Sequence, residues 1–184
     1  TDGTYFETCG RKTHIKQYGE IAVYNALAAA GALIALGFDR TQVLDSLGSV
    51  KGAPGRLEKL ELNKDFSVYI DYAHTPDGLI KAIRALRGIT KNRLITLFGC
   101  GGDRDKTKRP EMGRAAVEGS DAVIITTDNP RTEDPDKIIA DILEGTLGLE
   151  NKMYIIPDRE EAIRFSLSLL KPGDTLLLAG KGHE

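Results

Sequence analysis

The chain has 184 residues, of which 41% are hydrophobic and 28% are charged. This composition can bury a core, so it excludes a disordered chain and predicts one globular domain with a small additional part. The formal net charge of −2 gives no basic field that would attract nucleic acid. No apolar run approaches the roughly 20 residues of a membrane-spanning helix, and nothing resembles a signal peptide.

The two cysteines, Cys9 and Cys100, form neither a CxxC pair nor a cluster with histidine. A disulfide framework and a structural zinc site are therefore not expected, and a reducing, cytoplasmic environment is favoured. The chain starts without Met and stops at Glu184, directly after a glycine-rich motif. We therefore expect a fragment of a longer protein.

Residues 1–52 differ in pattern from the rest of the chain. An Ala-rich apolar segment predicts a helix over 21–36, with Gly37 as its C-terminal stop. A second, short helix is expected over 39–47. The turn-rich segment 48–56 then predicts a domain boundary.

From residue 57 onward, short apolar strands alternate with helices. Near-continuous Val, Ile and Leu runs in such an alternation predict a largely parallel sheet that is covered on both faces. The expected fold class is therefore α/β, with a Rossmann-like domain over 53–184 and an additional edge strand near 57–62. We expect strands at 66–70, 94–98, 122–126, 153–156 and 175–178, and helices over 75–87, after Pro110, over 134–143 and over 158–170.

Four unusual segments each follow one of these strands: DYAHTP (71–76), GCGGDRD (99–105), DNPR (128–131) and GKGHE (180–184). The carboxyl ends of parallel strands converge on one edge of the sheet, and ligands bind at that edge. We therefore expect the four segments to face one cleft.

Each segment also has a plain structural reading. Arg131 can pair with a ligand carboxylate through its planar fork, but Asn-Pro is also an ordinary turn starter. Asp71 can hold ribose hydroxyls, or it can cap the next helix together with His74 and Thr75.

The glycine-rich segment 99–105 matches neither the GxxxxGK[ST] nor the GxGxxG pattern, and it can be a tight turn or a close approach of backbone to a ligand. Cys100 has no evident base partner, so a nucleophilic role is not expected. The GKGHE segment can hold a zwitterion or be a simple exposed end. Arg56 can be a surface residue or a phosphate contact, and Asn25 alone indicates little.

Taken together, six ordered segments resemble the Mur ligases, and within that family the enzymes that add a diamino acid. They are YNALAA (24–29), PGR (54–56), DYAHTPDGL (71–79), FGCGGDRDKTKRP (98–110), DNPR (128–131) and GKGHE (180–184). The resemblance covers nearly the whole chain. It implies that residues 1–52 end a central ATPase domain and that residues 53–184 form the C-terminal, amino-acid-binding domain.

The resemblance implies ATP-dependent and Mg²⁺-dependent amide formation in peptidoglycan biosynthesis. In this reaction meso-diaminopimelate is added to UDP-MurNAc-L-Ala-D-Glu through an acyl phosphate. The phosphate-binding loop and the Mg²⁺ ligands of the central domain are not in this chain, so no catalytic residue and no metal ligand is expected here. The expected partners are these small molecules, without nucleic acid or membrane, and the expected state is a cytoplasmic monomer.

The resemblance also implies roles for individual residues. Lysine-adding relatives lack an arginine at position 131, and an arginine there can pair with the extra carboxylate of diaminopimelate. One departure is Ala22, where the family often carries a further asparagine. The implied diaminopimelate contacts are Arg104, Asp128, Asn129, Pro130, Arg131, Gly180 and Glu184, and the implied ATP contacts are Asn25, Arg56, Asp71 and His74.

Two other functions remain open at this stage. One is a ligase that adds L-lysine or another diamino acid. The other is a non-catalytic module that binds an amino acid or a nucleotide. A dinucleotide oxidoreductase is not expected, because no GxGxxG opens the first strand–helix unit.

Overall fold

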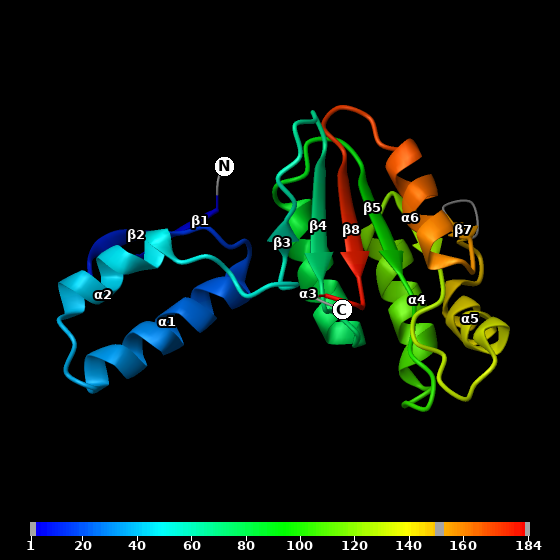
Figure 1. Ribbon diagram of the computed structural model, residues 1–184, viewed down its shortest axis with the longest axis horizontal. Helices are drawn as coiled ribbons and strands as arrows, with labels where there is room; N and C mark the ends of the chain where they lie inside the picture. The colour runs from blue at the N-terminus through cyan, green and yellow to red at the C-terminus, as the bar shows by residue number, and fades with distance from the viewer. Residues whose placement is uncertain (1–2, 150–152, 183–184) are drawn as a thin grey trace. The chain divides into compact units, whose positions relative to one another are not determined.

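The computed structural model describes residues 3–149 and 153–182 (Figure 1). The chain divides into two compact units, an N-terminal unit that ends at Ala53 and a C-terminal unit that begins at Pro54. Among the described residues, no helix has the length and apolar character needed to cross a membrane.

The N-terminal unit opens with an antiparallel hairpin of β1 (Thr4–Thr8) and β2 (Arg11–Ile15). The sequence analysis did not predict this hairpin. Its two-residue turn has φ of 52° at Cys9 and 73° at Gly10, the left-handed pair that a type I′ turn requires. Cys-Gly is not the Asn-Gly or Asp-Gly sequence that normally marks such a turn, so the signal for a hairpin in the sequence was weak.

The hairpin is followed by α1 (Glu20–Ala35), α2 (Arg40–Ser46) and the short 3₁₀ helix η1 (Leu47–Ser49). Gly37 has φ of 93° just beyond α1, as predicted for its stop. The buried core of this unit consists of Ile15, Ala30, Val43, Leu44 and Leu47.

The C-terminal unit is built on a six-stranded sheet, and the α/β prediction is confirmed (Figure 1). The strand order is β3-β4-β8-β5-β6-β7, and every pair is parallel except β3 with β4. The strands are β3 (Glu58–Lys59), β4 (Ser67–Asp71), β5 (Leu94–Phe98), β6 (Ala122–Ile125), β7 (Met153–Ile155) and β8 (Thr175–Ala179). The short β3 lies where the extra edge strand was expected.

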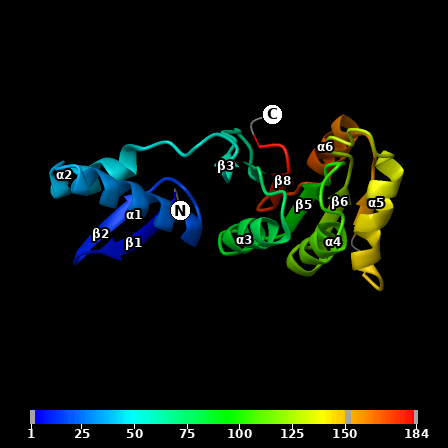
Figure 2. The same ribbon diagram turned by 90° about the horizontal axis from the view of Figure 1, so that it is seen from below.

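Helices cover both faces of this sheet (Figure 2). The connections after β4, β5 and β6 each lead to a strand closer to the β7 edge of the sheet. The connection after β7 leads back to β8, in the middle of the sheet. Right-handed crossovers therefore place α6 on the face opposite α3, α4 and α5. The helices are α3 (Pro76–Arg87), α4 (Lys108–Gly119), α5 (Pro135–Leu143) and α6 (Arg159–Ser168), and the 3₁₀ turn η2 (Glu144–Thr146) follows α5.

Local signals explain where these helices begin. Asp134 and Asp158 accept hydrogen bonds from backbone N–H groups in the first turns of α5 and α6. The helix expected after Pro110 is present as α4, but its start was misplaced, because α4 begins two residues before Pro110, at Lys108. Proline is tolerated there because the N–H groups of a first turn have no partner inside the helix.

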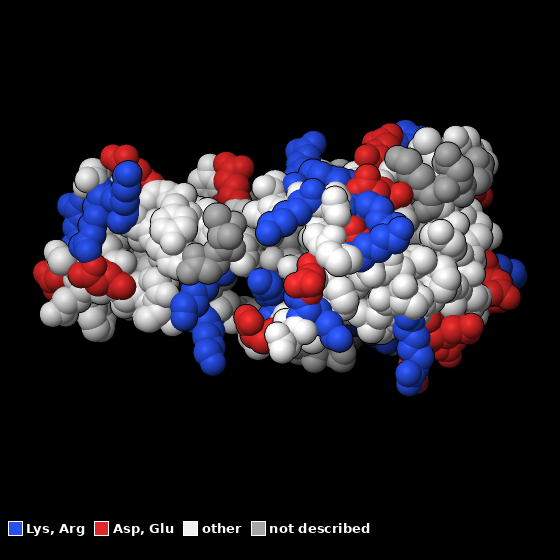
Figure 3. Space-filling view, turned by 90° about the horizontal axis from the view of Figure 1, so that it is seen from above, with Lys and Arg blue, Asp and Glu red and all other residues white. Residues whose placement is uncertain are grey.

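The edge at which the strands begin carries paired charges. Asp174 has only 1% of its side chain exposed and accepts hydrogen bonds from Arg93 and from the backbone N–H of Lys171. Burial raises the pKa of Asp174, but these bonds outweigh it and lower the pKa below its usual value. Arg87 pairs with Asp121 nearby. Seen from above, basic and acidic side chains lie next to one another over this edge (Figure 3).

Candidate functional site

The opposite edge of the sheet brings the predicted loops together. Asp71 pairs with Ala179, and Phe98 pairs with Ile125, so the ends of β4, β8, β5 and β6 are level. The segments after these strands therefore leave the sheet at one edge, as predicted (Figure 2). Glu184, which the sequence analysis placed in this site, lies outside the described residues.

The turn after β8 occupies the middle of this edge. Gly180 has φ of 108°, and its N–H donates a hydrogen bond to the Asp71 carbonyl at 3.0 Å. A Cβ at Gly180 would lie 3.0 Å from Oδ2 of Asp128, and one at Gly182 would lie 2.9 Å from Cβ of Tyr72. Both positions require glycine, because φ is positive and the neighbouring side chain leaves no room. The turn thus touches a group of residues on each side.

On one side of this turn lie Asp128, Asn129 and Lys181. The Asp128 side chain is 10% exposed, and its Oδ1 accepts a hydrogen bond from the N–H of Asn129 at 2.7 Å. Lys181 Nζ lies 3.2 Å from Asn129 Oδ1 and 4.0 Å from Asp128 Oδ1. This arrangement presents a carboxylate, an amide and an ammonium group side by side.

Two exposed arginines, Arg104 and Arg131, belong to the loops next to this group. Within residues 3–149 and 153–182, neither guanidinium has a hydrogen bond or an ion pair. Arg131 has φ of 54°, an uncommon conformation for a residue with a side chain. The carbonyl of Pro130 accepts a hydrogen bond from the N–H of Glu133 at 3.0 Å, which closes the turn around Arg131. Unpaired guanidinium groups are ready to bind carboxylates.

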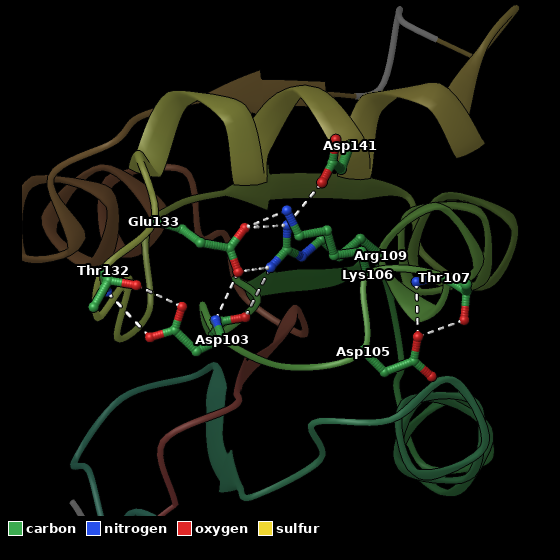
Figure 4. Close-up of polar contacts among 9 residues, drawn as sticks. Asp103, Asp105, Lys106, Thr107, Arg109, Thr132, Glu133 and Asp141 are labelled. Atoms are coloured by element: carbon green, nitrogen blue, oxygen red, sulfur yellow. Dashed lines mark hydrogen bonds and ion pairs between the residues drawn. The ribbon is translucent and has the colours of Figure 1, made fainter.

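A buried ion network supports these loops, and the sequence analysis did not identify it (Figure 4). The Arg109 side chain is fully buried, and its guanidinium contacts Glu133 at 2.8 and 3.0 Å and Asp141 at 2.7 Å. The Arg109 bonds are the main cause that lowers the pKa of Glu133 to about 2. The Nε atom of Arg109 is buried and has no hydrogen-bond partner among the residues that the structure describes. The network joins α4, α5 and the loop between β6 and α5.

On the other side of the β8 turn lies Asp71. Its carboxylate accepts hydrogen bonds from the N–H groups of Leu57 and Ala73, both at 2.8 Å. Burial raises the pKa of Asp71, although these two bonds and nearby Arg56 act in the opposite direction. Of the three residues considered as caps for α3, only Thr75 accepts a hydrogen bond from the helix, from Gly78.

Arg56, Tyr72, His74 and Lys108 complete this second group. The Arg56 guanidinium lies 4.8 Å from the centre of the Tyr72 ring, within range of a cation–π contact. The His74 ring meets Tyr72 edge-on, and its Nδ1 lies 2.9 Å from the Tyr72 carbonyl. Lys108 Nζ donates to the His74 carbonyl at 2.9 Å. Neither Tyr72 nor Lys108 was assigned a specific role from the sequence.

Two further residues bear on the site. Arg159, which was also missed, donates to the carbonyls of Ala179 and Thr127 and so ties the ends of β8 and β6 together. Burial lowers the pKa of Arg159, while Asp128 acts in the opposite direction. Asn25 belongs to the N-terminal unit, where it is exposed on α1.

Two kinds of chemistry find no support in the described residues. Burial raises the pKa of the Cys100 thiol to about 12, and this thiol donates to the Met112 sulfur, so it is not a nucleophile. No group of three or more His, Cys, Asp or Glu side chains in the described part of the chain is placed to hold a metal ion.

A hollow of about 250 Å³ lies between α3 and α4. Its walls include Ile80, Pro110 and Ala115, and it contains none of the residues of the two groups. It is therefore not part of the candidate site.

Residues 55–182 match the family model of the Mur ligase, glutamate ligase domain. The chain belongs to the Mur ligase family. A curated relative from Syntrophomonas wolfei, UDP-N-acetylmuramoyl-L-alanyl-D-glutamate–2,6-diaminopimelate ligase, is 48% identical over 172 residues. The match covers 93% of this chain and 35% of that ligase.

Two solved structures agree with the fold. A UDP-N-acetylmuramoyl-L-alanyl-D-glutamate–2,6-diaminopimelate ligase superposes with a TM-score of 0.69 at 42% identity, covering 95% of this chain and 36% of that one. The folylpolyglutamate synthase of Mycobacterium tuberculosis superposes with a TM-score of 0.76 at 21% identity, covering 98% of this chain and 43% of that one. The second likeness concerns the fold alone. The chain spans 35% of the curated Mur ligase and 36% of the solved one.

Proposed function

We propose that this chain is the diamino-acid-binding part of an ATP-dependent ligase that adds meso-diaminopimelate to UDP-MurNAc-L-Ala-D-Glu in peptidoglycan synthesis. The observation that carries the proposal is a pair of guanidinium groups, those of Arg104 and Arg131, that have no partner among the described residues. Their loops lie next to the group of Asp128, Asn129 and Lys181. The relative that is 48% identical carries the name of such a ligase.

The chemistry of the first group suits a diamino diacid. Meso-diaminopimelate carries a carboxylate and an amine at each end. Arg131 pairs with the distal carboxylate of this ligand, and Arg104 makes a second contact with a ligand carboxylate. The side-chain oxygens of Asp128 and Asn129 accept hydrogen bonds from an ammonium group of the ligand. Pro130 shapes the turn, and Gly180 keeps the site open to the ligand. Glu184 is proposed as the remaining contact.

The second group suits a nucleotide. The Arg56 guanidinium has no ion-pair partner among the described residues and is free to face a phosphate. Asp71, His74 and, from the N-terminal unit, Asn25 are the further proposed ATP contacts. ATP, when bound, supplies the phosphoryl group that activates the D-Glu carboxylate. We place the ligands of Mg²⁺ outside this chain.

The N-terminal unit fits a part of a larger ATPase domain. Helix α1 is apolar around most of its surface, and Tyr24 is 59% exposed there. An apolar helix of this kind normally lies inside a protein. We propose that residues 1–52 end the central ATPase domain, that residues 53–184 form the amino-acid-binding domain, and that the enzyme is a cytoplasmic monomer.

The test replaces Arg131 in the full-length ligase that carries this chain. Arg131→Gly removes the guanidinium without backbone strain, because glycine accepts the observed φ of 54°. Charge-assisted hydrogen bonds contribute about 1.5–3 kcal/mol, so we expect a KM for meso-diaminopimelate that is roughly 10- to 100-fold higher. The KM for ATP should stay unchanged.

Two outcomes would contradict the proposal. One is an unchanged KM for meso-diaminopimelate in Arg131→Gly. The other is a wild-type enzyme that uses L-lysine as well as it uses meso-diaminopimelate, which would identify a lysine-adding ligase instead.

A further inference from the structure

Two loops of the C-terminal unit carry the unpaired arginines, and a set of side chains joins these loops (Figure 4). The glycine-rich loop, residues 99–107, carries Arg104. The DNPR loop, residues 126–134, carries Arg131. We call Asp103, Thr132 and Glu133 the cross-loop clamp, because each of them bonds to the other loop.

The clamp is reciprocal. The Asp103 carboxylate accepts a hydrogen bond from the Thr132 hydroxyl at 2.7 Å and from the Thr132 N–H at 3.2 Å. The N–H of Asp103 in turn donates to Glu133 Oε1 at 2.6 Å. A further bond joins the N–H of Gly102 to the Asn129 carbonyl at 2.9 Å. The two loops are therefore held together by both backbone and side chains.

The far end of the clamp is anchored in the protein. Glu133 receives two hydrogen bonds from the buried Arg109 guanidinium and an ion pair from Lys106. Arg109 is held in addition by Asp141 on α5. If Glu133 moved away, the buried guanidinium of Arg109 would keep only Asp141 as an ion-pair partner, which would be costly, so the network holds Glu133 in place on the DNPR loop.

The clamp lies directly beside both arginines in the sequence. Arg104 follows Asp103, and Arg131 precedes Thr132. Both Asp103 and Arg131 have left-handed backbone, with φ of 52° and 54°. Aspartate adopts this conformation readily, but arginine does so only where its surroundings hold it. The bonds to Thr132 and Glu133 supply that constraint.

We propose that Asp103 is a positioning residue that fixes the spacing between Arg104 and Arg131, and thereby sets the affinity of the enzyme for the diamino acid. This inference rests on the proposed function, because it assumes that both arginines bind that ligand. The carboxylate of Asp103 bonds to the protein and not to the substrate. The carboxylate acts by fixing the positions of the two guanidinium groups before the ligand binds.

The experiment compares two changes at Asp103 in the full-length ligase. Asp103→Gly keeps the left-handed backbone and removes the carboxylate. We expect it to raise the KM for meso-diaminopimelate about tenfold and to change kcat at saturating diamino acid and the KM for ATP less than about twofold. Asp103→Asn keeps one acceptor oxygen, so its KM should lie between those of the wild type and Asp103→Gly. A residue that only stabilises the fold would lower the active fraction, and hence kcat, without this rise in KM.

The matched control is Asp105→Gly. Asp105 is a carboxylate in the same loop, but within the described part of the chain it accepts hydrogen bonds only from Thr107, in its own loop (Figure 4). Its variant should keep the wild-type KM for meso-diaminopimelate. An equal rise in KM for Asp105→Gly and Asp103→Gly would overturn the inference, because general loosening of the loop would then explain both.

A second variant keeps the inference testable if Asp103→Gly does not fold. Thr132→Val removes the hydroxyl at nearly constant shape and should raise the same KM. The double variant Asp103→Asn, Thr132→Val should show a smaller rise than the product of the single effects, since both changes break one contact. Independent effects on the KM would contradict the clamp.

If Arg131→Gly raises the KM for meso-diaminopimelate but neither clamp variant does, only this inference fails. If Arg131→Gly also has no effect, the proposed function fails.

Discussion

The side chain of Arg109 shows how strongly a single residue can organise the site. Its guanidinium is buried, and the carboxylates of Glu133 and Asp141 neutralise it. Removing either partner would leave a buried charge without full compensation, which is far more costly than losing an exposed ion pair. Glu133 is thus both a partner for a buried charge and a member of the cross-loop clamp.

A pH prediction follows from Glu133. Its folded pKa of about 2 lies below the ordinary value of 4.5. The ion pair therefore stabilises the protein fully above the ordinary value, and this contribution is lost as the pH falls from 4.5 towards 2. In Glu133→Gln, the free energy of unfolding should fall less steeply over this pH range than in the wild type. Urea unfolding at a series of pH values measures the slope.

The control for this prediction is Glu144→Gln, which removes the same charge from an exposed side chain. An identical slope in the wild type and in Glu133→Gln would contradict the role of the pair.

At this scale the sequence draws attention to the two loop arginines but not to the residues that support their loops. Arg104 and Arg131 were identified because they stand in short motifs after strands. Arg109 reads as one more basic residue in the run KTKRP, and its partner Glu133 is 24 residues further along the chain. No local pattern indicates that this arginine is buried, since its contacts with Gly101, Glu133 and Asp141 form only when α4, α5 and two loops come together.

At the scale of elements, the close approach of α4 to the end of α5 depends on small residues. A Cβ at Gly113 would overlap the Ile142 carbonyl oxygen, and one at Gly145 would overlap the carbonyl oxygen of Pro110. These glycines let two backbones touch, and so they set how Arg109 on α4 meets Asp141 on α5.

We predict that Gly145→Ala destabilises the protein by about 1–3 kcal/mol, because the added methyl group has to displace backbone atoms. The matched control is Gly88→Ala, at a position with φ of −64° and no close neighbour. Reduced loss of backbone entropy should leave its stability unchanged or higher by up to about 1 kcal/mol. Thermal unfolding of the two variants measures the difference, and equal melting temperatures would contradict the packing argument.

The type of most elements followed from periodicity and capping residues, whereas the hairpin did not. Strands β5 and β8 are nearly continuous apolar runs followed directly by glycine, and β4 ends at Asp71. Helices α3, α5 and α6 start behind Thr or Asp caps. In β1 and β2, charged residues occupy exposed positions and the turn is Cys-Gly. These strands depend on contacts with the N-terminal core rather than on a strong local preference.

At the scale of the molecule, the two units have different surfaces. The C-terminal unit buries a complete core that includes Leu97, Ile124 and Leu176. The N-terminal unit leaves large apolar side chains exposed, such as Leu36 at 77%. Both units have a buried core, but the smaller N-terminal unit exposes several large apolar side chains on and beside α1, and this surface suits burial in a larger structure.

We predict that the 184-residue chain by itself neither hydrolyses ATP nor uses it to form an amide bond. Its sequence contains no GxxxxGK[ST] loop, and its described residues hold no cluster of metal-ligating side chains. Phosphate release in the presence of ATP, Mg²⁺, UDP-MurNAc-L-Ala-D-Glu and meso-diaminopimelate is the measurement. Sustained ATP-dependent formation of the amide product by this chain would contradict the prediction.

The position of β8 has a consequence for how the protein is made. This strand comes last among those described, yet it lies between β4 and β5 in the sheet. A ribosome that has released β4, α3 and β5 has therefore produced two strands whose shared neighbour has not yet been synthesised. Their open edges remain available to other chains until that neighbour emerges, so folding during translation exposes this sheet to aggregation for most of the time that its domain takes to be synthesised.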